Sequence, residues 1–348
     1  LWGISEGGRR VLIIDRGFYS YFYAIPAEGR TAEEVVREIE RIRGTLPMIR
    51  GLEVVDRKLF GRPIRVVKVT CSDPEVMDKY ASKISKLRSV DRCLEHDIRY
   101  SMRYLIDNDV EPCGWHRIEV EEIEPKAQVD STFRALSRPE RVEKVGLPDL
   151  RILSFSPVYY SKKGSPKPGR NPVVVLSMVT SDGEEYQFVA EGEDDSGVLR
   201  GFVDVISKYD PDVILGFRSN RRDWNFLKER AKLHGIVLGV GRTGVEPHTS
   251  VYGHISVTGR ANVDLWDFIE EIPEIKLERL DEVADYFGVK KRGEWRYIEE
   301  HEIPTYWEER RDELLEFSME SARCIMGVGK ALLEFASELS RVVGIPLD

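Results

Sequence analysis

The sequence predicts a small α+β domain followed by a larger α/β domain in a chain of 348 residues. Strand and helix signals alternate through residues 1–125, as expected for a compact α+β module. Residues 126–149 are polar, contain prolines and show little periodicity, which favours a linker. From residue 150 to residue 348, short apolar strands alternate with amphipathic helical patterns. This length suffices for two or three domains with cores of their own.

Local signals predict the elements of the first domain. Thr31-Ala32-Glu33-Glu34 has the pattern of a capping box and predicts a helix that runs through Ile42. Gly61-Arg62 separates two apolar runs and predicts a hairpin, and Ser72-Asp73-Pro74 predicts the start of a second helix. The predicted strands are 11–14, 21–25, 52–60 and 63–71, the predicted helices are 31–42, 72–88 and 97–108, and residues 117–123 are predicted to be extended.

The second domain is predicted from the same kinds of signal. Ser181-Asp182-Gly183 joins two apolar runs as the turn of an antiparallel pair. A helix then leads to Tyr209, a short apolar strand follows, and a polar turn precedes a helix that has Asp223 near its start. The predicted strands are 151–155, 172–180, 185–191, 213–217 and 260–266, and the predicted helices are 196–209, 277–287 and 307–343.

The amino-acid composition argues against some classes of function but does not identify the function. The net charge of −9, from 52 basic and 61 acidic residues, is not typical of a nucleic-acid-binding protein, although local basic patches can still form such a surface. No apolar run is long enough for a membrane span, and no secretory segment opens the chain. The four scattered cysteines show no metal-binding spacing. We therefore expect a reduced, cytoplasmic location and no membrane partner, and the high content of charged residues is compatible with a thermophilic source.

Five segments occur in the order seen in one enzyme family. The segment Tyr209–Trp224 runs Tyr-Asp-Pro-Asp-Val-Ile-Leu-Gly-Phe-Arg-Ser-Asn-Arg-Arg-Asp-Trp, and it resembles the second exonuclease motif of family-B DNA polymerases, archaeal ones above all. Four further segments resemble sequence motifs of the same family: Arg103–Asp107, Gly259–Leu265, Glu316–Ala322 and Leu339–Leu347. The resemblance covers nearly the whole chain and implies an N-terminal domain, then a 3′→5′ exonuclease domain with a ribonuclease-H-like fold and a mixed sheet flanked by helices.

The same resemblance implies a nuclease site that has lost most of its ligands. In the family, the active site uses four carboxylates and a tyrosine, and the carboxylates hold two divalent ions such as Mg²⁺, which activate water. The matching residues of this chain are Ser156, Val158, Asp223, Phe317 and Ser321, so only Asp223 keeps its carboxylate. Because Mg²⁺ requires oxygen ligands and negative charge, we expect no metal site, no cofactor and no nuclease activity in this chain.

Basic and aromatic residues suggest sites for nucleic acid. Arg218 and Arg222 stand where the family motif has asparagine and phenylalanine, and Arg221 lies between them. These arginines either replace the charge of the lost metals and hold a DNA phosphate, or they are ordinary solvent-exposed residues. Tyr21 and Val90 match a pocket that reads template uracil in archaeal relatives, and the alternative is that both are core residues.

The resemblance leads to a preferred function and two alternatives. We expect the N-terminal and exonuclease-like portion of a family-B DNA polymerase, possibly an inactivated paralogue, that binds DNA in replication or repair and ends just before the polymerase palm. Its expected partners are single-stranded or primer-template DNA and a palm and thumb portion, in the same or a separate chain, which would place it at the nucleoid. The alternatives are an active metal-dependent 3′→5′ exonuclease with unorthodox ligands, and a protein-interaction subunit that does not bind DNA.

Overall fold

A computed structural model describes residues 1–144, 146–250, 253–270 and 279–347. The chain is mixed α/β with several sheets, and its contacts divide it into two units. The smaller unit contains Ile14–Glu121 and Arg134–Glu143, and the larger contains Leu1–Ile13, Glu122–Phe133 and Lys144–Asp348. The domain boundaries expected at residues 125 and 149 refer to family domains, and they stay predictions.

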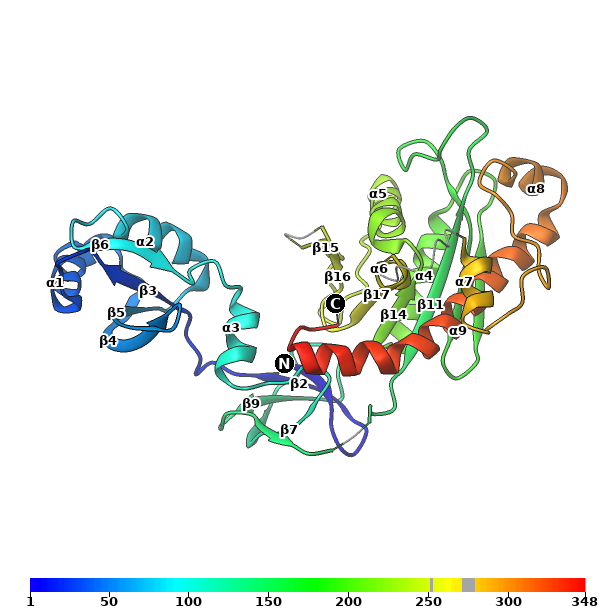
Figure 1. Cartoon of the computed structure of the whole chain (residues 1–348). Coiled ribbons are helices and arrows are strands. Elements are labelled where there is room, and N and C mark those ends of the chain that lie inside the picture. The colour runs from blue at the N-terminus through cyan, green and yellow to red at the C-terminus, as the bar shows by residue number, and fades with distance from the viewer. Residues whose placement is uncertain (145, 251–252, 271–278, 348) are drawn as a thin grey trace. The chain divides into compact units, whose positions relative to one another are not determined.

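The smaller unit is built on a four-stranded sheet with the order β4-β5-β3-β6. The capping box at Thr31 and the hairpin at Gly61 are both present, as predicted. Helices α1 and α2 lie against this sheet (Figure 1). Their apolar side chains share a core with Phe22 and Ala24 of strand β3. The elements are β3 (Tyr21–Pro26), α1 (Ala32–Ile42), β4 (Ile49–Leu59), β5 (Arg62–Cys71), α2 (Met77–Ile84), β6 (Val90–Leu94), α3 (Tyr100–Asp107), β7 (Trp115–Arg117) and β10 (Glu140–Val142).

The segment expected to be a linker contains strands. Residues 131–135 form β9, which lies in a second sheet with the order β1-β2-β9-β8, and β10 pairs antiparallel with β7. These pairings join residues that lie far apart in the sequence, so local periodicity carries no sign of them. The strands of the second sheet are β1 (Trp2–Ile4), β2 (Arg10–Ile14), β8 (Val120–Ile123) and β9 (Ser131–Ala135).

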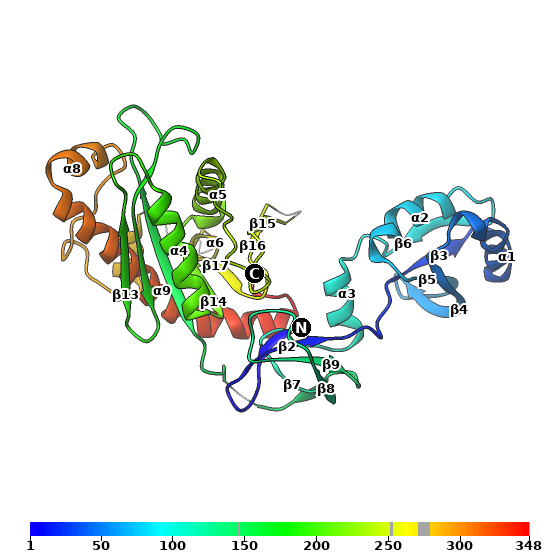
Figure 2. The same cartoon turned by 180° about the vertical axis from the view of Figure 1, so that it is seen from behind.

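A five-stranded mixed sheet with the order β13-β12-β11-β14-β17 forms the centre of the larger unit. Its strands β11, β14 and β17 are parallel, and β12 and β13 extend it antiparallel. Helices α4 and α5 pack on one face, and α9 covers the other (Figure 2). These elements are β11 (Ile152–Tyr159), β12 (Val173–Thr180), β13 (Glu185–Val189), α4 (Ser196–Tyr209), β14 (Val213–Gly216), α5 (Trp224–Leu233), β17 (Ala261–Asp264) and α9 (Arg311–Val343).

Successive side chains of β11 point to opposite faces of the sheet and therefore enter the two cores in turn. Leu153 and Phe155 belong to the core shared with α4 and α5, while Ile152 belongs to the core shared with α9. The hydroxyl of Ser154 donates to the carbonyl of Ala322 on α9 at 2.8 Å. A side chain added at Gly329 of α9 would collide with Leu215 of β14, so this glycine allows the helix to lie close to the sheet.

The long helix expected from Trp307 to Val343 is interrupted. Arg310 leaves the helical region at φ −137° and separates α8 from α9, and no glycine or proline marks that break in the sequence. Its guanidinium bonds to Glu313 and to the hydroxyl of Tyr306. The start of the helix expected at 277–287 lies outside the described residues. The remaining elements are β15 (His248–Thr249), β16 (Ile255–Ser256), α6 (Leu265–Ile269), α7 (Leu280–Tyr286) and α8 (Ile303–Glu309).

A buried ionic network ties β2 to the central sheet of the larger unit. Asp212 accepts from Arg10 at 2.9 Å and from Arg242 at 2.7 Å. Asp210 accepts from Arg242 at 3.1 Å and from Arg260 at 2.6 Å. All five residues are buried. Three guanidinium groups thus share two carboxylates, and each carboxylate is needed to offset buried positive charge.

Candidate functional site

The three motif segments meet around the second half of β11. The hydroxyl of Ser318 on α9 donates to the carbonyl of Ser156 at 3.3 Å, and the hydroxyl of Tyr159 donates to Asp223 at 2.7 Å. Val158 shares an apolar cluster with Phe317 of α9. The structure therefore brings together the segments that carry Ser156, Val158, Asp223, Phe317 and Ser321, which lie far apart in the sequence.

Asp223 is a buried carboxyl that accepts a hydrogen bond from Tyr159. It is 8% exposed, and burial raises its pKa to about 7, although the Tyr159 hydrogen bond and the Arg222 charge act in the opposite direction. The guanidinium of Arg222 lies 4.7 Å from the centre of the Tyr159 ring and pairs with Glu300 at 2.6 Å. Tyr159 and Arg222 thus both lie close to this carboxyl.

Val158 lies in an apolar environment. It is 3% exposed and packs in a cluster with residues of β12, α8 and the start of α9. Phe317, from the same cluster, stacks against Trp295 with ring centres 5.9 Å apart and meets Tyr297 edge-on at 5.6 Å. A carboxylate at position 158 would be buried against these side chains, at a large cost in desolvation free energy.

The hydroxyl of Ser321 is used within its own helix. It donates to the carbonyl of Phe317, one turn earlier in α9, at 2.8 Å. The adjacent Glu320 is also buried, and although burial acts to raise its pKa, hydrogen bonds from Lys290 and Arg323 lower it overall. The charge of Glu320 is therefore neutralised by these two basic residues.

The turn that follows β14 is held by buried hydrogen bonds. The backbone N–H groups of Arg218 and Asn220 donate to Asp264 at 2.7 and 2.8 Å, and burial raises the pKa of Asp264 to about 6. Asn262 of β17 donates to Asn220 at 2.9 Å and accepts from the indole of Trp224 at 2.9 Å. These bonds fix a π-helical turn, Ser219–Asp223, ahead of α5.

The three arginines of this turn have different surroundings. Arg218 lies with its guanidinium 3.9 Å from the centre of the Trp266 ring, and its Nε atom is buried without a hydrogen-bond partner among the described residues. Arg221 is exposed and pairs with Glu270, and Arg222 pairs with Glu300. Two of the three are thus neutralised by a glutamate.

The residues at the motif positions do not fit a pair of Mg²⁺ ions. One buried carboxyl, two serines and two apolar side chains offer too few oxygen ligands and too little negative charge. Across the described ranges, no group of three or more histidine, cysteine, aspartate or glutamate side chains has an arrangement that would hold a metal ion.

Tyr21 and Val90 belong to different apolar clusters of the smaller unit. Tyr21 lies with Tyr23 and Ile25 in one cluster, and its hydroxyl donates to Asp107 at 3.0 Å. Val90 lies in the core formed with α1 and α2. Lys68 and Arg103 lie near the Tyr21 ring at 3.9 and 4.4 Å from its centre, and burial raises the pKa of its hydroxyl.

Sequence reasoning missed three residues at the site, Tyr159, Trp266 and Glu300. Tyr159 directly follows the first motif and was detectable as a neighbour of Val158 in the strand. Trp266 follows the end of β17, next to the end of the parallel strand β14, so topology places it beside the turn. Glu300 lies between α7 and α8, and no local sequence pattern predicts its ion pair with Arg222.

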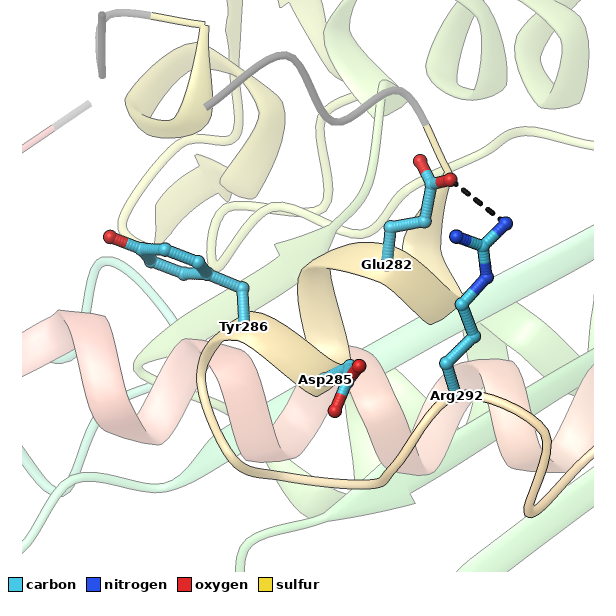
Figure 3. Close-up of a pocket in the computed structure, with 4 residues that line it drawn as sticks. All are labelled: Glu282, Asp285, Tyr286 and Arg292. Carbon is cyan, nitrogen blue, oxygen red and sulfur yellow. Dashed lines mark ion pairs between the residues drawn. The ribbon is translucent and has the colours of Figure 1, made fainter. Parts of the chain in front are cut away.

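A surface hollow lies apart from these segments in the sequence. It measures about 280 Å³ and is lined by Glu282, Asp285 and Tyr286 of α7 and by Arg292 of the following loop (Figure 3). Arg292 pairs with Glu282 at 3.1 Å across its edge. None of its lining residues belongs to a nuclease motif, so we assign the hollow no role in the proposed function.

Comparisons with known proteins agree on one family. The model of the exonuclease domain of family-B DNA polymerases matches residues 92–283. The chain is 37% identical to DNA polymerase 2 of Aeropyrum pernix and 34% identical to DNA polymerase 3 of Saccharolobus solfataricus, and it covers 44% and 45% of their lengths, with all of its own length aligned.

A solved structure gives the same result. The family-B DNA polymerase from the hyperthermophilic archaeon Pyrobaculum calidifontis superposes with a TM-score of 0.93 and 42% sequence identity, over 100% of this chain and 45% of that one. The chain thus spans less than half the length of these relatives. Within the described residues, no helix combines the length and apolar character that a membrane crossing requires.

Proposed function

This chain belongs to the family-B DNA polymerases as an N-terminal and exonuclease portion, and we propose that it has lost proofreading nuclease activity and serves as a DNA-binding and scaffolding module. The ribonuclease-H-like fold that the family implies is part of this proposal. The mixed sheet supports it, because three antiparallel strands are followed by two parallel ones, with helices on both faces.

The environment of Asp223 carries the proposal. It is the one carboxylate left among the matched motif positions, and it is buried against Tyr159 with Arg222 beside it. A catalytic metal pair needs several ionised carboxylates open to substrate. A single carboxyl whose pKa is raised to about 7 by burial favours the proton over a metal ion. An exonuclease with unorthodox ligands would require this carboxyl to become ionised and exposed.

The proposed partners are DNA and a palm and thumb portion in the same or a separate chain, within the cell. The relatives are more than twice as long as the matched part. The last turns of α9 also expose an apolar stripe, which a further domain would cover; it consists of Phe335, Leu339, Val342 and Val343. A role in replication or repair follows from the family as a proposal.

We expect the chain to bind single-stranded DNA without a divalent metal. Fluorescence anisotropy with a labelled oligothymidylate should show binding in EDTA that is at least as tight as in Mg²⁺, because the residues present do not fit a metal bridge and Mg²⁺ competes for the DNA phosphates. The logarithm of the affinity should fall linearly with the logarithm of salt concentration, since phosphate contacts release counterions. Absence of salt-dependent binding would favour a protein-interaction subunit instead.

A further inference from the structure

We propose that Arg218 is a phosphate-binding residue that holds a phosphodiester of single-stranded DNA at the carboxyl edge of the central sheet. This inference rests on the proposed function, because it assumes that the chain binds DNA. It adds which residue makes the contact and explains why the contact does not need a metal.

The backbone of Arg218 adopts a conformation that is unfavourable for arginine. Its φ of 61° lies in the left-handed region, which is unfavourable for a non-glycine residue. Asparagine, the residue of the family motif at this position, tolerates that region far better than arginine. The chain therefore carries backbone strain at this position that the residue of the family motif would relieve.

The guanidinium adds a second cost. Its Nε atom is buried and has no hydrogen-bond partner among the residues that the structure describes, and no ion pair in those ranges includes Arg218. A buried donor without a partner is unfavourable until an acceptor arrives. A phosphate oxygen is the acceptor that a planar guanidinium binds best.

The surroundings fit a nucleic-acid strand. Arg218 and Trp266 follow the carboxyl ends of two adjacent parallel strands, β14 and β17, the edge at which open α/β sheets bind ligands. Trp266 is partly exposed and supports the guanidinium at 3.9 Å, and an aromatic surface of this kind also stacks bases. Among the residues that the structure describes, Arg221 and Arg222 pair with Glu270 and Glu300, whereas no ion pair includes Arg218.

The test exploits the opposite effects of one substitution on stability and binding. Arg218→Asn should raise the thermal midpoint, because it relieves the left-handed strain and removes the unpartnered donor. The same change should weaken binding of a labelled oligothymidylate in EDTA at least about tenfold, the value of a charged hydrogen bond. It should also lower the salt slope by about 0.7, as expected for one phosphate contact on a single strand. Arg218→Lys, which keeps the charge without the planar fork, should retain part of the affinity.

Arg200→Gln on the exposed surface of α4 is the matched control, since it removes one positive charge at a position outside the motif segments. It should leave affinity and salt slope within error. If the wild-type chain binds DNA and Arg218→Asn binds equally well with an unchanged slope, the inference is wrong while the proposed function stands. If the wild-type chain does not bind DNA, both are wrong. Equal effects of Arg218→Asn and Arg200→Gln would show a nonspecific charge effect and would also overturn the inference.

Discussion

Replacement of Asp212 by alanine is expected to lower the free energy of unfolding by about 3–5 kcal/mol, the usual cost of removing one partner from a buried ion pair. Asp212 accepts from Arg10 and Arg242 and from the backbone N–H of Arg151 at 2.9 Å. Its removal takes away the carboxylate that Arg10 pairs with and leaves Arg242 and Arg260 to share Asp210. Chemical denaturation at neutral pH measures the loss.

The control and the local readout separate this effect from a general loss of charge. Asp204→Ala, on the exposed surface of α4, should change stability by no more than about 0.5 kcal/mol. Because Arg10 belongs to β2, hydrogen exchange in residues 10–14 should accelerate more than exchange in β11. A loss below about 1 kcal/mol in Asp212→Ala would show that the network contributes little to the fold.

Replacement of Asp223 by asparagine is expected to stabilise the chain increasingly as pH rises from about 4 through about 7. In the native state burial raises the pKa of Asp223 to about 7, whereas the unfolded carboxyl loses its proton near its ordinary value of 3.8. Between these values the native state binds more protons than the unfolded state, so wild-type stability falls with rising pH. Asparagine does not titrate, so it removes this pH-dependent loss of stability, and its side-chain oxygen can still accept the Tyr159 hydrogen bond. The gain should reach a few kcal/mol at pH 8, since one pKa unit corresponds to about 1.4 kcal/mol.

Unfolding profiles of the two proteins between pH 4.5 and pH 8 provide the measurement. The difference between them isolates Asp223 from other titrating groups. Tyr159→Phe should have the opposite effect and extend the fall in stability to higher pH, because the lost hydrogen bond lowers the pKa of Asp223 in the wild-type chain. Parallel wild-type and Asp223→Asn profiles would contradict a buried, protonated carboxyl.

Much of the local structure could be predicted from the sequence, because its signals act over a few residues. The capping box at Thr31 and the turn at Gly183 occur as expected. The strands β9 and β10 could not be predicted, since their partners lie far away in the sequence. The break at Arg310 was also invisible, because it depends on the way α8 and α9 pack rather than on a helix-breaking residue.

The candidate site shows the same division. The motifs located the segments that meet at β11, and family membership is confirmed. The partners that define their chemistry come from elsewhere. Glu300 pairs with Arg222, and Trp295 packs on Phe317. Such contacts depend on the fold of a long connecting segment, so no spacing rule reveals them. Loss of activity stays a proposal.

The most direct test of that proposal is a nuclease assay with a 3′-labelled single strand in Mg²⁺ and in Mn²⁺. The wild-type chain should release no more nucleotide than its Asp223→Ala variant, and a chelator should change neither rate, because the residues at the motif positions do not fit a metal pair. Metal-dependent release by the wild-type chain that disappears in Asp223→Ala would contradict the account.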